Sequence, residues 1–333
     1  MQFDQLRRRE FITLLGGAAV AWPLTAGAQQ ARKTPRIGVL WHAGSAEEEG
    51  PYFTSLLQGF RDLGYVEGKT ITFEHRFPNE IPDRFKSMAA ELASLHVDVL
   101  VSVGNVASPY AKNATTTIPV VFVIVPDPVG TKLVENFARP GGNVTGLSTY
   151  ASDVVGRRLQ LLKEIIPGLS RVAQLVNPNS PASRLHIELT QAAAAELGLT
   201  VQRFEARSLD ELEPTVDAMA GAGMQAITVN PEGLAFQGRA IIPKLALSRR
   251  LALCAYSRET FEPGALMSYG VDQRAICRRA AVYVDKILKG TKPGELPVEG
   301  PTTFEFLINR KTAKQLGFDV PPTLLARANE VIE

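Results

Sequence analysis

The sequence predicts an α/β fold built of two doubly wound units that follow one another along the chain. From Pro35 onward, short apolar runs rich in β-branched residues alternate with segments of helical pattern, and the same rhythm starts again after residue 148. Runs that are apolar throughout are what a parallel sheet covered on both faces requires. The 333 residues are enough for two domains, each with its own core.

We expect four strands in the first unit, with one crossover helix between successive strands. The strands are RIGVLW (36–41), TITFEH (70–75), VDVLVSV (97–103) and PVVFVIV (119–125), and the helices lie at about 49–63, 82–95 and 105–114. Ser45 and Glu48 have the spacing of a capping box before the first helix, and Gly64 follows its end. A Gly/Pro-rich stretch, RPGGNVTGLS (139–148), then predicts a connection between domains.

The second unit repeats this pattern but not its residues. Its expected strands are RVAQLVN (171–177), TVQRFEA (200–206), QAITVN (225–230) and LALCAYS (251–257), with helices at about 153–166, 182–197, from 209 onward, and 236–249. Ser208 and Glu211 form another capping-box pattern.

The residues beyond Tyr269 are too few for a third domain. A helical pattern at 273–289 precedes a second Pro/Gly-rich crossing, GTKPGELPVEGP (290–301), which is followed by TFEFLIN (303–309) and a short helix, RKTAKQLG (310–317). We expect this tail to return and complete the two units. Several crossings of chain would then join them and act as a hinge.

The N-terminus has the pattern of an export signal. Arg7, Arg8 and Arg9 precede an uncharged run from Ile12 to Ala26, and a small-residue site ends at Ala28. The arginines and the apolar residues after them resemble the twin-arginine motif, although the Sec route tolerates the same residues. The run is too short to span a bilayer, which takes about 20 apolar residues. We therefore expect residues 1–28 to be a signal that is removed near Ala28, which leaves a periplasmic protein that does not span the membrane.

The composition excludes several classes of function. The net charge is +2, and basic residues around the signal account for it, so no basic stripe suggests a nucleic-acid partner. The four histidines are scattered without metal-ligand spacing, and no glycine fingerprint for a dinucleotide follows the first run. Cys254 and Cys277 are expected to be buried thiols, with a disulfide left open. The sequence shows no motif that pairs a nucleophile with a general base. We therefore expect a protein that is not an enzyme and that binds no cofactor and no metal.

The ends of the predicted strands carry the candidate ligand-binding residues. In open α/β sheets, ligands bind beyond the carboxyl ends of the strands, where helix N-termini present free N–H groups. The segments at these ends are Trp41 to Ser45, Gly104 to Val106 and Pro126 to Pro128 in the first unit, and Asn177 to Ser180, Asn230 to Glu232 and Tyr256 to Ser257 in the second, with Tyr269 on a crossing. Each Asn-Pro or Asp-Pro pair is also an ordinary turn former. Together, amides, an acid and aromatic rings are the groups that orient a small polar ligand in a cleft.

Six segments in order resemble the substrate-binding proteins of ABC transporters of the tryptophan/tyrosine-uptake type. They are LGYVEGKTITFEHRF, TTTIPVVFVIVPDPVG, RPGGNVTGLS, LVNPNSP, LMSYGVD and ILKGTKPGELPVEGPTTFEFLINRKTAKQLGFDVP. The resemblance implies a type I periplasmic-binding-protein fold: two Rossmann-like lobes with parallel sheets, joined by three crossings. The expected lobes are residues 34–146 with about 271–296, and 147–270 with about 297–333. Members of this family bind a small solute between the lobes and deliver it to a permease in the inner membrane, without chemistry.

In this family the loop after the third strand and the Asp-Pro after the fourth face the cleft, and the resemblance therefore implies Gly104, Asn105, Val106 and Asp127 as cleft residues. Together with candidates from the other strand ends and the crossing, the expected ligand-binding set is Trp41, Gly104, Asn105, Val106, Asp127, Asn177, Asn230, Tyr256 and Tyr269. The N–H groups of residues 104–106 and Asn177 would hold an anionic group such as a carboxylate, and Asp127 would take an amine. Trp41, Tyr256 and Tyr269 would wall the apolar part. The loop VGNVAS and the strand end AYSRE depart from members that take aromatic amino acids, so the solute itself is not carried over.

Two rival functions and one rival ligand stay open. A ligand-sensing module that docks on a membrane receptor would use the same two-lobed fold. A secreted enzyme would need a cluster of a nucleophile and a base, which the sequence does not show. A sugar is an alternative to an amino acid or another carboxylate, because aromatic and amide groups suit sugars as well.

Overall fold

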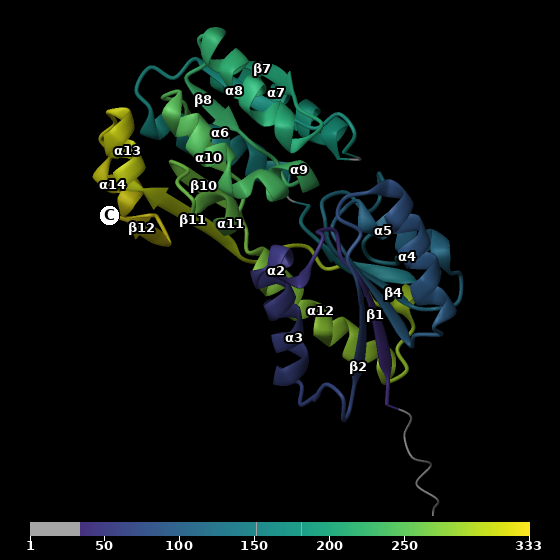
Figure 1. The fold of residues 1–333 in the computed structure, drawn as a ribbon. Coiled ribbons are helices and arrows are strands. Elements are labelled where there is room, and N and C mark those ends of the chain that lie inside the picture. Colours follow the sequence, from purple (N-terminus) through teal and green to yellow (C-terminus); the bar gives the residue numbers. More distant parts are fainter. Residues whose placement is uncertain (1–33, 151, 181) are drawn as a thin grey trace, which may run out of the picture. The chain divides into compact units, whose positions relative to one another are not determined.

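Two β-sheets with helices on their faces make up the structure, which is a computed structural model (Figure 1). It describes residues 34–333 except Ala151 and Pro181, and Pro35–Glu333 form one compact unit. The predicted export signal therefore lies outside the described residues.

The first sheet has five parallel strands in the order β2-β1-β3-β4-β5. The strands are β1 (Arg36–Leu40), β2 (Thr72–Arg76), β3 (Val99–Val103), β4 (Val120–Val125) and β5 (Val144–Ser148). The inner strands β3 and β4 are buried along their whole length because helices cover both faces, whereas the edge strand β2 is only partly buried. Val101 and Val121 pack on one face, and Leu100 and Phe122 pack on the other.

Four helices and one short turn of helix cover this sheet. They are α2 (Ala46–Glu49), α3 (Pro51–Asp62), α4 (Pro82–Ser94), α5 (Ala107–Ala114) and α12 (Gln273–Leu288). Helices α3 and α12 contact each other on one face, and α4 and α5 pack on the opposite face (Figure 1). The late helix α12 thus belongs to the core of the first sheet.

The second sheet has seven strands in the order β12-β11-β10-β9-β8-β6-β7. They are β6 (Arg171–Val176), β7 (Thr200–Glu205), β8 (Ala226–Thr228), β9 (Ala252–Ala255), β10 (Met267–Val271), β11 (Phe304–Asn309) and β12 (Glu330–Ile332). Only the β10–β11 pair is antiparallel among the described strands. The expectation of two mostly parallel sheets is therefore confirmed.

The helices of the second sheet also lie on two faces. They are α6 (Ser152–Ile165), α7 (Ser183–Leu197), η1 (Leu209–Glu211), α8 (Leu212–Gly221), α9 (Gly233–Gln237), η2 (Gly238–Ala240), α10 (Ile242–Ser248), α11 (Arg258–Phe261), α13 (Arg310–Leu316) and α14 (Pro322–Leu325), and η3 (Pro293–Glu295) lies on the way back from α12. Helices α8 and α10 share one core, whereas α6, α7 and α13 share the other.

The chain passes between the sheets three times within the described residues. It leaves the first sheet after β5, returns from β10 into α12, and runs back through residues 296–303 into β11. Leu147 and Glu299 form an isolated parallel bridge where two of these crossings lie side by side.

The stretch predicted as a plain connection contains an edge strand. Residues 144–148 form β5, which pairs with β4, and Gly146 lies so close to Phe122 that a Cβ atom would be 2.1 Å from the Phe122 carbonyl oxygen. The glycine that suggested a loop is required here for close packing of two backbones.

Two predicted helices are divided in the structure. The helical segment expected after Ser45 is interrupted at Gly50, which has a φ of 56°. The helix expected at 236–249 is divided into α9, η2 and α10. Ser45 caps α2 by accepting from the Glu48 N–H, as expected, but Glu48 accepts from Gly44 instead of Ser45. The Ser208 side chain makes no capping bond.

Candidate functional site

Two adjoining chambers lie where strands of both sheets end. The first, the Arg158 chamber, contains Arg158, and the second, the Glu232 chamber, contains Glu232. Both are also lined by four shared residues, which are Pro126, Pro231, Tyr256 and Gln273. Pro126 follows β4 of the first sheet, and Tyr256 follows β9 of the second. The chambers are therefore two parts of one cleft.

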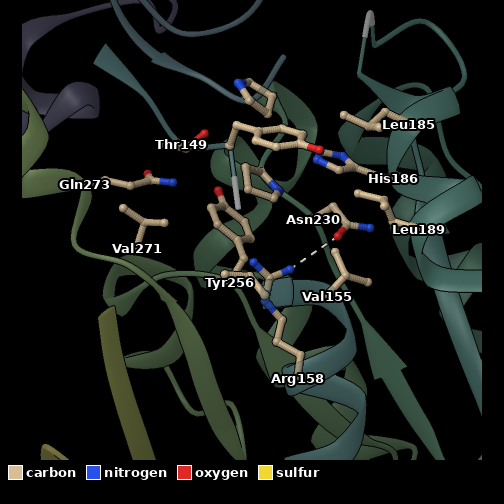
Figure 2. A pocket seen from close by; sticks show the side chains of 14 residues that line it. Thr149, Val155, Arg158, Leu185, His186, Leu189, Asn230, Tyr256, Val271 and Gln273 are labelled. Atoms are coloured by element: carbon tan, nitrogen blue, oxygen red, sulfur yellow. Dashed lines mark hydrogen bonds between the residues drawn. The ribbon is translucent and has the colours of Figure 1, made fainter. Parts of the chain in front are cut away.

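The Arg158 chamber combines an apolar wall with a few polar groups. Figure 2 shows Val155, Leu185 and Leu189 near His186 and Asn230. Burial, together with the charge of Arg158, lowers the pKa of His186 to about 4, so this ring is neutral at pH 7.

Arg158 is a buried cation in helix α6, with 4% of its surface exposed. Its Nε donates to the Tyr269 carbonyl oxygen at 2.7 Å, and Nη1 lies 3.5 Å from the Val229 carbonyl oxygen. Nη1 also lies 3.3 Å from Asn230 Oδ1 (Figure 2). Burial lowers the pKa of its guanidinium. In the described part of the chain, no carboxylate lies within ion-pair distance of it.

The Glu232 chamber contains two acidic residues and one histidine, His42. Glu80 and Glu232 both line it, and both Glu232 oxygens accept from the backbone N–H of Asn177, at 3.1 and 3.2 Å. Burial raises the pKa of Glu232 to about 8; the Asn177 bond lowers it and the Glu80 charge raises it. This carboxyl therefore holds a proton at neutral pH.

His42 lies between two acids at the rim of this chamber. Its Nε2 is 3.3 Å from Glu49 Oε2, and its Nδ1 is 3.2 Å from Glu80 Oε1. Burial lowers the pKa of His42, and the charge of Arg239 lowers it too. The charges of Glu49 and Glu80 outweigh both effects and raise this pKa to about 9. The ring is therefore a cation at neutral pH, and it balances buried Glu49.

Asn105 carries two polar atoms that the protein itself leaves unused. It stands in the loop between β3 and α5 and lines the Glu232 chamber. Its Nδ2 and Oδ1 are both buried, and neither has a hydrogen-bond partner among the described residues. Buried amide atoms nearly always have partners, so this side chain is placed to bind something else.

Five of the nine residues that the sequence suggested lie in the cleft. Gly104, Asn105 and Val106 line the Glu232 chamber, Asn230 lines the Arg158 chamber, and Tyr256 lines both. Of the three loop residues, Gly104 already donates its N–H to the Val123 carbonyl oxygen. A sixth, Asn177, lines an adjoining groove beside Asn79 and Arg207.

The remaining three predicted residues line neither chamber. Trp41 is fully buried in the first core, where its Nε1 donates to His75 Nδ1 at 3.1 Å, so it is corrected to a core residue. Asp127 accepts from the Gly130 N–H at 2.8 Å and closes its own turn. The Tyr269 ring stacks on Phe304 and packs in the second core.

Arg158 was not among the residues that the sequence suggested. The signal was present, because Arg158 follows Val154 and Val155 at helical spacing and precedes Leu161 and Leu162 on the same apolar stripe. A cation on the buried face of a helix needs an anionic or hydrogen-bonding partner, so its position suggests a ligand-binding residue. Glu232 and Glu80 were also missing from the predicted set, although Glu232 stood in a named strand end.

The described residues hold no group of three or more His, Cys, Asp or Glu side chains that could bind a metal ion. Within the same residues, no helix is long and apolar enough to cross a membrane. Cys254 and Cys277 are both buried, free thiols.

Residues 51–332 match the family described as ABC transporter substrate binding protein. The chain therefore belongs to this family. It is 25% identical over 290 residues to the tyrosine-binding protein of Clostridioides difficile. The aligned region covers 86% of this chain and 81% of that protein.

Solved structures show the same fold. A Streptococcus pneumonia ABC domain in complex with L-Trp matches with a TM-score of 0.84 and 26% identity over 90% of this chain and 100% of that one. A conserved domain protein from Vibrio cholerae matches with a TM-score of 0.85 and 29% identity over the same shares. A ligand-free, open substrate-binding protein with adhesive properties from Clostridium difficile matches with a TM-score of 0.67 and 21% identity over 90% of this chain and 99% of that one. The chain has the type I periplasmic-binding-protein fold.

Proposed function

We propose that this protein is the solute-binding component of an ABC importer and that it holds a small amino acid or related carboxylate in the cleft. The protein would be exported to the periplasm by its N-terminal signal and would pass the solute to a permease in the inner membrane. The lobes would be the ones expected from the sequence, residues 34–146 with 271–296 and 147–270 with 297–333. Three crossings of chain suit closure by hinge motion around a ligand.

The observation that carries this proposal is the Asn105 amide, which is buried at the cleft without a partner. A small solute with a donor and an acceptor would satisfy both of its atoms. Nearby groups add to the recognition: Asn230 and Tyr256 offer hydrogen bonds, and the N–H groups of Asn105 and Val106 precede helix α5. The relatives that bind tyrosine and tryptophan make amino acids the first solutes to test.

A thermal-shift screen of the purified protein tests the proposal. The panel holds L-tryptophan, L-tyrosine, other amino acids, non-amino carboxylates, sugars and nucleosides. A ligand at a hundred times its dissociation constant should stabilise the folded state by about 2.7 kcal/mol. We expect a hit among the amino acids or carboxylates, recovered chemically unchanged.

The variant Asn105→Ala should weaken that hit about tenfold, because a ligand group would lose its partner. Asn113→Ala, at an exposed position of the same helix, is the matched control and should bind as the wild type does. A panel without a hit, or turnover of the compound, would refute a solute-binding function. Equal affinity in Asn105→Ala would remove the observation that supports this site.

A further inference from the structure

The charge of Arg158 is not neutralised by the protein. Among the described residues, Arg158 is the only charged one that lines its chamber, and the rest of that lining is apolar or uncharged at pH 7. Proteins rarely bury a charge without an opposite charge beside it, because removal from water is costly. An unpaired, buried guanidinium in a cleft therefore indicates that the opposite charge arrives with a ligand.

Hydrogen bonds to the protein do not fully use this guanidinium either. Only the 2.7 Å bond from Nε to the Tyr269 carbonyl oxygen has a good length, and the Nη1 contacts at 3.3 and 3.5 Å are long. The Nη2 group has no hydrogen-bond partner among the described residues. A structural tether explains the Nε bond but leaves most of the five N–H donors unexplained.

The two chambers differ in their charged residues. Arg158 lines one chamber, whereas Glu80, Glu232 and the cation His42 line the other, and Tyr256 and Gln273 line both. Val155, Leu185 and Leu189 beside Arg158 give this chamber an apolar wall for a nonpolar part of the ligand. The arrangement suits a molecule with one carboxylate, an apolar body and a cationic group.

We propose that Arg158 is the carboxylate anchor of the cleft and selects a monocarboxylate with an apolar body, such as a hydrophobic amino acid. This rests on the proposed function and deepens it, because it names the group that recognises the anion. It also replaces our expectation that the N–H groups of residues 104–106 hold the carboxylate. The fork of the guanidinium would bind the two carboxylate oxygens in the plane that its free N–H groups define.

The first test uses the wild-type protein and pairs of compounds that differ only in charge. L-tryptophan is compared with L-tryptophanamide, and L-tyrosine with L-tyrosinamide, by isothermal titration calorimetry. We expect each acid to bind about ten- to a hundredfold more tightly than its amide, because hydrogen bonds to a charged group are strong when water is excluded. An amide that binds as tightly as its acid overturns the proposal without any variant.

The second test changes the anchor. Arg158→Met keeps the length of the side chain and removes the charge, and Arg158→Lys keeps the charge without the fork. We expect Arg158→Met to bind the acid about thirtyfold more weakly and the amide nearly unchanged, so the preference for the acid disappears; Arg158→Lys should retain part of it. Arg157→Met, one residue away and bonded to Gln160 on the surface, is the matched control and should keep the full preference.

The outcomes separate this inference from the proposed function. A compound that binds the wild type and Arg158→Met equally well refutes the anchor and leaves a solute-binding protein. A panel in which no compound stabilises the wild type refutes both. A loss of stability in Arg158→Met alone cannot mimic the result, because it would not change the ratio of acid to amide affinity.

Discussion

Tyr52 and Glu259 are joined by a buried hydrogen bond of 2.9 Å, although 207 residues separate them in the sequence. Tyr52 lies in α3 against the first sheet, and Glu259 lies in α11 beside the second. Glu259 also accepts from Arg274 Nε at 2.6 Å, and the Tyr52 hydroxyl is 2.5 Å from Gln273 Oε1. The group links the two sheets next to the Glu232 chamber, which Tyr52 and Gln273 also line.

Tyr52→Phe should lower the free energy of unfolding by about 2 kcal/mol, because a buried hydrogen bond to the Glu259 side chain, which is paired with Arg274, is lost. Urea unfolding followed by circular dichroism measures this change. Tyr110→Phe is the control: Tyr110 stacks on Phe85, and its hydroxyl has no hydrogen-bond partner in the described residues. An unchanged midpoint for Tyr52→Phe would mean that the linkage does not stabilise the protein.

Gly59 permits the close contact of α3 and α12. A Cβ atom at Gly59 would lie 2.1 Å from the Arg278 carbonyl oxygen, so Gly59→Ala must push the two helices apart. We expect a loss of about 3 kcal/mol in stability, at the upper end for overpacking. Gly221→Ala, where no atom lies within 4 Å in α8, should be neutral or slightly stabilising. Equal stabilities for the two variants in thermal unfolding would contradict the close contact.

The fold could be predicted from the sequence because parallel strands buried on both faces leave a strong local signal. The runs that became β3 and β4 are apolar at nearly every position, and helices of regular period separate them. The strand β5 was missed because a glycine such as Gly146 is typical of loops in the local sequence. The close approach of Gly146 to Phe122 depends on tertiary structure, which the sequence does not show. The same sheet geometry led to the choice of Asn105 and Tyr256 from their positions after strands, and both line the Glu232 chamber.

The charges of the site could not be predicted in the same way. Trp41 directly follows β1, but its ring turns into the core, where it stacks on Phe77. Asp127 also follows a strand, yet its carboxylate closes a local turn. Whether a strand-end side chain faces the cleft or the core depends on packing, and a residue such as Arg158 reaches the cleft from a helix of the other unit.

His42 should titrate far from the usual range for histidine. Burial lowers the pKa of His42, but Glu49 and Glu80 raise it to about 9, whereas burial lowers the pKa of His186 to about 4. Because the folded-state pKa of His42 is raised, its stabilising contribution is complete below about pH 6.5 and is lost as the pH rises through about 9. That contribution is at most about 3 kcal/mol.

Nuclear magnetic resonance of the histidine rings checks this directly, with signals assigned through His→Gln variants. We expect the His42 signal to shift near pH 9, and the double variant His42→Gln/Glu49→Gln to lose less stability than the wild type between about pH 7 and pH 10. His96→Asn, at an exposed position, is the control for the loss of a histidine. A His42 ring that titrates near pH 6.5 would show that the two acids do not hold its proton.

Glu232 should make the affinity for an amine depend on pH. Burial raises its pKa to about 8, so below that pH the ligand-free protein holds a proton on the carboxyl that an ammonium group needs ionised. Binding must then release this proton, and the affinity for L-tryptophan or L-tyrosine should rise up to about tenfold per pH unit until it levels off near pH 8. Calorimetry at about pH 6.5, 7.5 and 8.5, in buffers of different ionisation enthalpy, measures both the affinity and the protons released.

Glu232→Gln should lose the pH dependence and bind more weakly at pH 8.5, whereas Glu196→Gln, exposed on α7, should behave as the wild type does. An affinity that is constant over this range, and the same in Glu232→Gln, would place the amine of the ligand away from this carboxylate and leave Glu80 as its remaining acidic partner in the chamber.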